Sequence, residues 1–376
     1  MSAALFFYGT LCHIPLLEIV LGRPKAQIDF CDAVLPDHLV SWVKDQPFPM
    51  IAPHQGADAT GIYVQGLSTE DIARLRFYEG GFEYDLARVT VTTAHGSAPA
   101  DVFFPQAGVW HAGAPWVLQD WIAEWGKLSE HAAIEAMEHY AKTPVDEVAR
   151  LLPFLRARGW AKELAQDSAP TTLRRNTQSR DVTLTPTHNG FAEFFRLDTF
   201  DVSYPRFDGQ QSETLQRSAF VAYDAALVLP YDPATDHVLL IEQMRYGPLL
   251  RGDPYPWVLE PIAGLVDAGE LPIETARREA VEEAGLDLQD IRPMMQTYPS
   301  PGYSTEFFHC FLGICALEPS MEGTHGLASE NEDIRTHVLS FDKAMELLDS
   351  GETNLGPTTM MLLWIARHRD RLRAEL

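Results

Sequence analysis

The stretch "GLVDAGELPIETARREAVEEAGL", residues 264–286, concentrates five glutamates in one short segment. Three of them, Glu279, Glu282 and Glu283, are spaced so that a helix would place them on one face. Two carboxylates ~5–6 Å apart repel by about 3 kcal/mol at an effective dielectric near 20. A hard divalent cation such as Mg²⁺, or Mn²⁺ in its place, would relieve this repulsion because it prefers oxygen ligands. A solvated acidic helix face is the alternative interpretation.

The residues around these glutamates favour the metal site. Gly264 and Gly269 allow a tight loop before the helix, Arg278 can pair with Glu270, and Gly285 can end the helix. The segment resembles the signature of the Nudix family, G-x5-E-x7-R-E-U-x-E-E-x-G-U, in which U is an apolar residue. The residues that match its fixed positions are Gly264, Glu270, Arg278, Glu279, Glu282, Glu283 and Gly285.

This resemblance implies a fold and a reaction for the C-terminal half. Nudix domains are α/β/α sandwiches that cleave nucleoside diphosphates linked to another group. The carboxylates of Glu279, Glu282 and Glu283 and the main-chain carbonyl of Ala263 would hold Mg²⁺. Glu283 is also counted among the catalytic residues.

More of the C-terminal half resembles one branch of the family, the bacterial ADP-ribose pyrophosphatases. Pro301 stands sixteen residues after Gly285, where that branch has its marker proline, and "VLLIEQMRYG" and "PWVLEPIAG" are also similar. The resemblance implies Mg²⁺-dependent hydrolysis of ADP-ribose to AMP and ribose 5-phosphate. The residues that it assigns to substrate binding are Arg217, Arg245, Ser300 and Glu306.

The acidic loop "ASENED", residues 328–333, is the candidate source of the catalytic base. Hydrolysis of a diphosphate needs a base that takes a proton from water, beside cations that neutralise the developing charge. The resemblance assigns Glu330 as that base and Glu332 as a further metal ligand. An exposed acidic loop without such a role is the alternative interpretation.

Two departures from the branch leave the substrate open. Ser218 follows Arg217 where many relatives have glutamate, and Tyr303 replaces a frequent glycine. Another nucleoside diphosphate sugar or a dinucleotide is therefore an alternative substrate. A non-catalytic ADP-ribose sensor is a further alternative, although such proteins usually lose glutamates that this chain keeps. In the branch, the region around Arg217 crosses to a partner subunit, so we expect a homodimer through the Nudix domain.

The N-terminal stretch "FFYGTL" resembles the γ-glutamylcyclotransferase-like (AIG2-like) family, a β-barrel with helices. In that family a Tyr-Gly-Thr-Leu turn binds a γ-glutamyl group, and a glutamate shuttles a proton during ring closure to 5-oxoproline. "RLRFYEGGFEYDLARVTV" places Glu79 in that role, but Arg76 and Leu86 stand where aspartate and arginine are common. A positioning module without activity is thus the alternative to a bifunctional enzyme. The implied binding residues are Tyr8, Gly9, Thr10 and Leu11.

Composition divides this α+β chain and limits its partners. Residues 169–182 are polar and read as a linker between a domain at 1–168 and one at 183–376. A formal charge of −24 argues against wide contact with nucleic-acid phosphates. Four scattered cysteines, no signal peptide and no apolar run of about 20 residues predict a cytoplasmic protein without a membrane segment.

Overall fold

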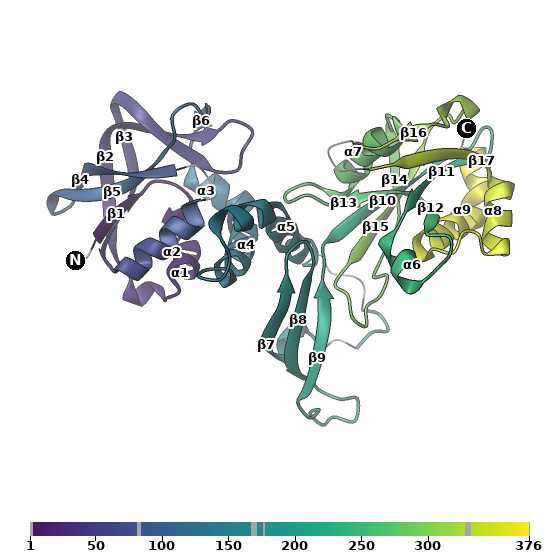
Figure 1. Ribbon diagram of the computed structural model, residues 1–376, viewed down its shortest axis with the longest axis horizontal. Helices are drawn as coiled ribbons and strands as arrows, with labels where there is room; N and C mark the ends of the chain where they lie inside the picture. The colour runs from purple at the N-terminus through teal and green to yellow at the C-terminus, as the bar shows by residue number, and fades with distance from the viewer. Residues whose placement is uncertain (1–2, 81–83, 167–170, 176, 328–331, 376) are drawn as a thin grey trace. The chain divides into compact units, whose positions relative to one another are not determined.

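The computed structural model describes residues 3–80, 84–166, 171–175, 177–327 and 332–375. The chain forms two compact units, Met1–Ala169 and Pro170–Leu376, coloured from purple to teal and from teal to yellow in Figure 1. The predicted linker lies at this division, and its described part contains the short helix η5 (Ser179–Asp181). No helix in the described ranges is long and apolar enough to cross a membrane.

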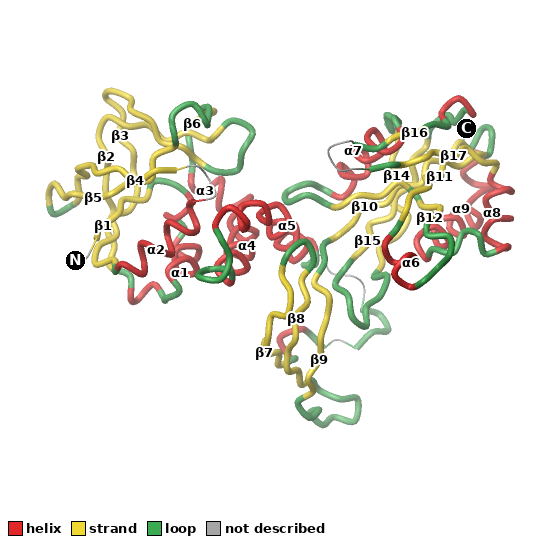
Figure 2. Tube along the Cα trace, viewed as in Figure 1, coloured by secondary structure: helices red, strands yellow, loops and turns green. Residues whose placement is uncertain are grey.

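Five strands of the N-terminal unit close into a barrel (Figure 2). Their order is β3-β1-β5-β4-β2, and β2 pairs back with β3 to complete the ring. Only the pairing of β1 with β5 is parallel among these neighbours. The strands are β1 (Ala3–Phe7), β2 (Asp29–Val43), β3 (Pro49–Leu67), β4 (Tyr84–Thr93) and β5 (Gly96–Pro105), and β6 (Ala112–Pro115) extends the sheet beside β2.

Alternation along β1 supplies two cores, because successive side chains of a strand point to opposite faces. Phe6 and Tyr8 pack among apolar residues of the other four barrel strands, whereas Leu5 and Phe7 pack with the helices. The helices are α1 (Ile14–Leu21), α2 (Thr69–Glu79), α3 (Leu118–Trp121), α4 (Lys127–Glu138) and α5 (Val145–Leu164), with shorter turns η1 (Thr10–Cys12), η2 (Lys25–Gln27) and the π-helical η4 (Ile122–Gly126). The expected barrel with helices is confirmed.

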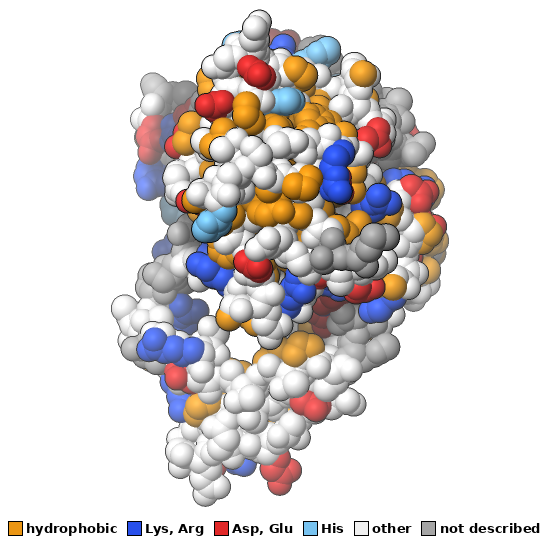
Figure 3. Space-filling model, turned by 90° about the vertical axis from the view of Figure 1, so that its left-hand side faces the viewer, with side chains coloured by type: hydrophobic (Ala, Val, Ile, Leu, Met, Phe, Trp, Pro, Cys, Tyr) orange, Lys and Arg blue, Asp and Glu red, His pale blue; other side chains and the backbone are white. Residues whose placement is uncertain are grey.

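The surface of the protein mixes apolar and charged side chains. Figure 3 shows patches of hydrophobic side chains between lysine, arginine and acidic groups on one face. Exposed large apolar residues of the N-terminal unit include Leu39, Val109, Val117 and Ile134.

A mixed sheet forms the centre of the C-terminal unit. Its strand order is β14-β15-β10-β11-β17-β16, with β12 beside β11 and β13 beside β10. The central neighbours β10 and β15 are parallel. The strands are β10 (Asp224–Asp232), β11 (His237–Met244), β12 (Trp257–Glu260), β13 (Ile262–Leu265), β14 (Asp290–Thr297), β15 (Phe307–Ile314), β16 (Thr324–His325) and β17 (Ile334–Ser340).

Helices cover both faces of this sheet, so the expected α/β/α sandwich is confirmed (Figure 1). On one face, α8 (Phe341–Ser350) and α9 (Gly356–Ala374) enclose a core with alternate residues of β10, β11 and β15. On the other face, α7 (Pro272–Ala284) packs on β10 and β13. The short helix α6 (Tyr246–Arg251) and the turn η6 (Pro319–Met321) lie in connections.

A separate antiparallel sheet, β7-β8-β9, precedes the sandwich. It consists of β7 (Thr183–Ala192), β8 (Arg196–Ser203) and β9 (Leu215–Val221). Its strands carry mostly exposed or half-buried side chains, among them Phe191, Phe220 and, in the β8–β9 loop, Phe207. A small sheet with so little buried surface gains little stability of its own.

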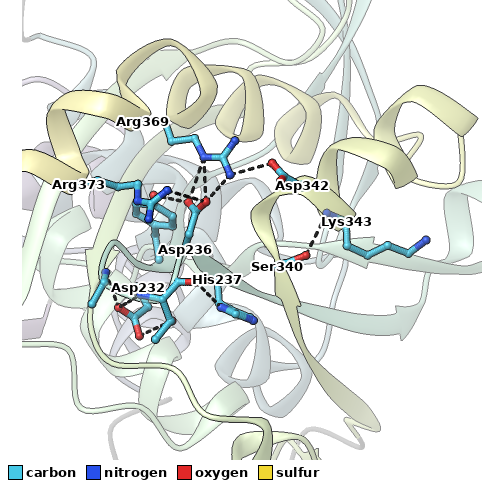
Figure 4. Close-up of polar contacts among 11 residues, drawn as sticks. Asp232, Asp236, His237, Ser340, Asp342, Lys343, Arg369 and Arg373 are labelled. Atoms are coloured by element: carbon cyan, nitrogen blue, oxygen red, sulfur yellow. Dashed lines mark hydrogen bonds and ion pairs between the residues drawn. The ribbon is translucent and has the colours of Figure 1, made fainter.

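Asp236 ties the C-terminal helix to the sheet (Figure 4). It lies in the β10–β11 turn with φ 63°, a left-handed conformation that aspartate tolerates. Its carboxylate accepts hydrogen bonds from Tyr231 Oη at 2.8 Å, from Arg369 Nε at 3.1 Å and from Arg373 Nη1 at 3.2 Å. Burial opposes ionisation of this carboxyl, but the hydrogen bonds from Arg369 and Tyr231 outweigh it and lower the pKa of Asp236.

We predict that Asp236→Asn lowers the free energy of unfolding by about 2 kcal/mol at pH 7, because charge-assisted hydrogen bonds contribute about 1.5–3 kcal/mol. The difference from the parent should shrink as pH falls below about 4, where the unfolded carboxyl is protonated. Urea denaturation at pH 7 and pH 3.5 measures both effects. Asp45→Asn, at an exposed aspartate with φ 60°, is the matched control. Equal midpoints for Asp236→Asn and the parent would contradict the prediction.

Candidate active site

Helix α7 is held where its acidic residues face the β13 strand and the loop that follows it. Pro272 occupies its first turn, Glu274 Oε2 accepts a hydrogen bond from Leu271 N at 3.0 Å, and Gly285 ends it with φ 64°. Ala276, Ala280 and Ala284 are buried against the sheet. The helix is therefore fixed by small apolar contacts and caps, and its longer polar side chains form the site.

Arg278 is the hub of the glutamate cluster. Its guanidinium donates to Glu270 Oε2 at 3.2 Å, to Glu279 Oε1 at 2.7 Å and to Glu282 Oε2 at 2.9 Å. It also donates to the carbonyl of Leu265 at 3.3 Å. The pair of Glu270 with Arg278 expected from sequence is present, and the same arginine fastens the loop before α7 to two of the three clustered glutamates.

Glu283 differs from its neighbours because it is only 2% exposed. Its Oε2 accepts a hydrogen bond from Ala263 N at 3.0 Å. Burial raises the pKa of Glu283 to about 9 against this hydrogen bond, and the charges of Glu279 and Glu332 add to the rise. Burial likewise raises the pKa of Glu279 to about 7 despite Arg278. The three glutamates therefore do not form the solvated acidic face of the alternative interpretation, because Glu283 is buried and Glu279 and Glu282 are half-buried.

The backbone leaves room for these carboxylates at Gly264. A β-carbon at this position would lie 1.7 Å from Glu279 Oε1 and 2.0 Å from its Cδ. Glycine at this position leaves room for the Glu279 carboxylate to lie against β13. The Glu279 carboxylate of α7 therefore occupies the space beside Gly264 of β13.

The donor chemistry of this cluster fits a hard divalent cation. In the part of the chain that the structure describes, no three His, Cys, Asp or Glu side chains are grouped so that they could hold a metal ion as they stand. Glu279 and Glu282 instead face Arg278. The ligand atoms available are nevertheless all oxygens, and the charge of Glu332 acts on both Glu279 and Glu283. A cation that prefers oxygen ligands would offset this mutual repulsion.

Arg245 borders the cluster and brings in a residue that sequence reasoning missed. Its Nε lies 2.7 Å from Glu260 Oε2, and its positive charge also acts on Glu283 and Glu306. Burial raises the pKa of Glu260 and of Glu306, and Arg245 partly offsets both shifts. The signal for Glu260 was present in "PWVLEPIAG", where one acid interrupts an otherwise apolar run.

Other expected site residues have different surroundings. Ser300 forms a turn, in which its carbonyl accepts hydrogen bonds from Tyr303 N and Ser304 N. Arg217 lies on β9 and donates to the carbonyl of Gln216. Within the described ranges, no hydrogen bond or ion pair joins either side chain to the glutamate cluster. Glu330, the candidate base, lies outside the described residues.

The residues of the predicted γ-glutamyl site lie in the turn after β1 and at the end of α2. The turn from Tyr8 to Leu11 follows β1, and a β-carbon on Gly9 would lie 2.6 Å from Pro49 Cγ, so glycine is required. Tyr8 Oη donates to the carbonyl of Phe103 at 2.9 Å. Glu79, at the end of α2, is partly buried, and this burial raises its pKa to about 7. Burial, together with the charges of Tyr84 and Glu79, raises the pKa of Tyr8, which places these three groups close together.

Comparison with known proteins gives a family match for each unit. Residues 222–359 match the NUDIX domain family, and residues 5–123 match the family described as gamma-glutamyl cyclotransferase, AIG2-like. An ADP-ribose pyrophosphatase of Escherichia coli (strain K12) is 36% identical over 213 residues, which are 56% of this chain and 99% of that protein. An ADP-ribose pyrophosphatase of Haemophilus influenzae is 31% identical over 216 residues, 57% of this chain and 96% of that protein. A GDP-mannose pyrophosphatase of Escherichia coli (strain SMS-3-5 / SECEC) is 31% identical over 172 residues, 46% of this chain and 88% of that protein.

The raised pKa of Glu79 makes stability depend on pH. Between about pH 4.5 and about pH 7 the folded state keeps a proton that the unfolded state releases, so the free energy of unfolding falls as pH rises through this window. We predict that Glu79→Gln removes this fall and gains stability relative to the parent by on the order of 1–3 kcal/mol at pH 8. Thermal and urea unfolding at pH 5 and pH 8 measure it. The exposed Glu124→Gln is the control, and parallel pH profiles for Glu79→Gln and the parent would refute the prediction.

Proposed function

The chain belongs to the Nudix hydrolase family, and we propose that its C-terminal unit hydrolyses the diphosphate of ADP-ribose to AMP and ribose 5-phosphate. The observation that carries this proposal is the convergence of Glu279, Glu283 and Glu332, whose negative charges act on one another beside Arg245. Relatives named as ADP-ribose pyrophosphatases cover more of the chain than the relative named for GDP-mannose. The residues that match the NUDIX domain family, 222–359, lie in the C-terminal unit that contains the cluster.

Each group of the site has a proposed part in this reaction. The carboxylates of Glu279, Glu282, Glu283 and Glu332, with the carbonyl of Ala263, would hold Mg²⁺, and Mn²⁺ is a possible substitute. When bound, Mg²⁺ would neutralise charge that develops on the diphosphate oxygens. Arg245, oriented by Glu260, donates charge-assisted hydrogen bonds to the substrate's anionic oxygens. Glu330 would take the proton from the attacking water.

Ser300, Glu306 and Arg217 are the proposed contacts to the sugar end of the substrate. Glu306 is supported by its place near Arg245, whose charge acts on its carboxyl. The loop that carries Ser300 and Glu306 is joined to β9, because Phe220 N donates to Tyr303 O at 2.7 Å and Thr305 N donates to Phe220 O at 3.0 Å. This connection links the β7-β8-β9 sheet to the proposed sugar site.

A substrate screen tests the proposal directly. The full chain is incubated with ADP-ribose, GDP-mannose, another nucleotide sugar and a dinucleoside diphosphate, with Mg²⁺ or with EDTA. A phosphatase then releases inorganic phosphate only from the monophosphate products. We expect ADP-ribose to give the highest kcat/KM with Mg²⁺, and no turnover in EDTA. A higher kcat/KM for another compound would overturn the substrate assignment, and full turnover in EDTA would overturn the role of the glutamates.

We predict that Glu283→Gln lowers kcat/KM by about 100-fold or more. The amide can still accept the hydrogen bond from Ala263 N but carries no charge for a cation that contributes several kcal/mol to the transition state. Steady-state kinetics and thermal unfolding without added metal are compared for both proteins, and the thermal midpoint should not fall. Asp287→Asn, an exposed charge loss just beyond α7, is the matched control. A Glu283→Gln variant with parental kcat/KM would remove Glu283 from the mechanism.

We also propose a homodimer formed through the β7-β8-β9 sheet. Phe191 and Phe220 of this sheet and Phe195 of its β7–β8 turn are each exposed by nearly half, and Phe207 of its β8–β9 loop is 92% exposed. Residues 171–221 hold six arginines and six acidic residues, so this region carries no net charge in a chain of −24 and can meet a second copy without repulsion. Light scattering that reports the monomer mass at micromolar concentration would contradict the dimer.

A second candidate activity, γ-glutamyl ring closure, is favoured in the N-terminal unit by one observation. Glu79 has a pKa of about 7 through burial and lies among tyrosines, which suits a group that must both take and give a proton near neutral pH. The substrate amine would attack the γ-carbonyl, 5-oxoproline would form and an amine would leave. Incubating the full chain with γ-glutamyl dipeptides tests this. Formation of 5-oxoproline by the parent but not by Glu79→Gln supports it, and no product from the parent refutes it.

A further inference from the structure

The loop between β16 and β17 rests on a rigid base. The two strands pair through His325 with Ile334 and Thr324 with Arg335. Below them, Thr336 is fully buried, and its Oγ1 donates to the carbonyl of Met321 at 2.8 Å and accepts from Gly323 N at 2.9 Å. Strand pairing and the buried Thr336 hydroxyl therefore fix the two ends of this loop. Gly326 lies at its start and Glu332 near its end.

Glu332 is fastened to the start of the loop by two hydrogen bonds. Its backbone N donates to the carbonyl of Leu327 at 3.3 Å, and its Oε2 accepts from Leu327 N at 3.0 Å. The side chain is half-buried. The hydrogen bond from Leu327 N thus gives the Glu332 carboxylate a defined position.

Gly326 makes this closure possible. Its φ is +103°, a conformation that residues with a β-carbon rarely adopt. A β-carbon at this position would also lie 2.7 Å from Glu332 Cβ and 3.3 Å from both the carbonyl carbon and oxygen of Glu332. Two of these three atoms belong to the backbone, so the clash cannot be relieved by turning a flexible side chain. Any other residue at 326 must push Glu332 away.

The position of Glu332 matters because the root of this loop lies beside α7. Strand β16 contacts this helix, and a β-carbon on Gly285, at the end of the helix, would lie 3.7 Å from His325 Cε1. The negative charge of Glu332 acts on Glu279 and on Glu283, which belong to a different element of the C-terminal unit. Coulomb interactions between groups at a partly exposed site fall off steeply with distance, so a small displacement changes them.

We propose that Gly326 is a positioning residue, which holds the Glu332 carboxylate on the side of the loop next to α7, so that it can join Glu279 and Glu283 in binding a divalent cation. This inference rests on the proposed metal-dependent hydrolysis. It adds that the close contact of Gly326 with Glu332, at the root of the β16–β17 loop, determines where the Glu332 carboxylate lies. A turn glycine without this role would affect stability alone.

The test compares three variants of the full chain. Gly326→Ala introduces the clashing methyl group. Glu332→Gln removes the charge but leaves an acceptor for Leu327 N. Gly351→Ala is the matched control, since Gly351 ends α8 with φ +81° and a β-carbon there meets nothing within 4 Å. This control reproduces the backbone strain without displacing Glu332.

Mn²⁺ affinity is measured by titration calorimetry without substrate, and kcat and KM are measured as a function of Mg²⁺ concentration. We expect Gly326→Ala and Glu332→Gln each to weaken Mn²⁺ binding about 10-fold and to raise the Mg²⁺ concentration for half-maximal rate by a similar factor. KM at saturating Mg²⁺ should change little. Gly351→Ala should bind Mn²⁺ as the parent does, even where its thermal midpoint falls as far as that of Gly326→Ala.

Two results would overturn the proposal. One is parental Mn²⁺ affinity in Gly326→Ala together with weakened binding in Glu332→Gln, which would show that Glu332 tolerates the added methyl group. The other is parental affinity in Glu332→Gln itself, which would leave Gly326 nothing to position. If no nucleoside diphosphate is turned over while both variants still weaken Mn²⁺ binding, the substrate proposal fails and the role of Gly326 stands.

Discussion

Repulsion among carboxylates at the edge of the central sheet is the constraint around which the C-terminal unit is arranged. Glu283 is almost fully buried, and Glu279 and Glu332 bring further negative charge to the same place. Burial disfavours the ionised form of a carboxyl group, and it raises the pKa of Glu279 to about 7 and of Glu283 to about 9. Arg278 and Arg245 compensate only part of this charge. Such a cluster of like charges destabilises the folded state, and arrangements of this kind are typical of functional sites.

The frame around the cluster is correspondingly rigid. Small residues of α7 pack closely on the sheet, and Gly264 lets β13 approach the Glu279 carboxylate. On the far face, α9 is fastened to the β10–β11 turn by the hydrogen bonds of Asp236 with Arg369 and Arg373 (Figure 4). The ligand groups therefore come from elements that cannot easily move apart. Close packing and buried hydrogen bonds hold like charges together that would separate on a flexible segment.

Each unit contains a glutamate whose pKa is raised by burial, Glu79 in the N-terminal unit and Glu283 in the C-terminal unit. The side chains around these two glutamates differ. In both, removal from water is the main cause that raises a glutamate pKa. Glu79 lies near the phenol groups of Tyr8 and Tyr84, which are neutral at physiological pH, so it can exchange a proton without a counter-ion. Glu283 lies near other carboxylates, whose negative charges disfavour its ionised form. A bound cation would stabilise that ionised form. The first arrangement suits proton transfer and the second suits metal binding.

Sequence alone determined the features that depend on local spacing. The Gly264–Leu286 pattern predicted a helix ended by Gly285, because helix periodicity and the glycine cap are local properties of the chain. The expected pair of Glu270 with Arg278 joins the loop before α7 to the helix and is present as well. The apolar run in "ALFFYGTL" is typical of a buried strand, and β1 spans Ala3–Phe7. Only the tertiary structure decided burial and long-range proximity. It turned Glu283 inward, joined Glu260 to Arg245 across fifteen positions, and set Gly326 against Glu332. Those contacts depend on how strands and loops pack, and no short-range periodicity in the chain encodes them.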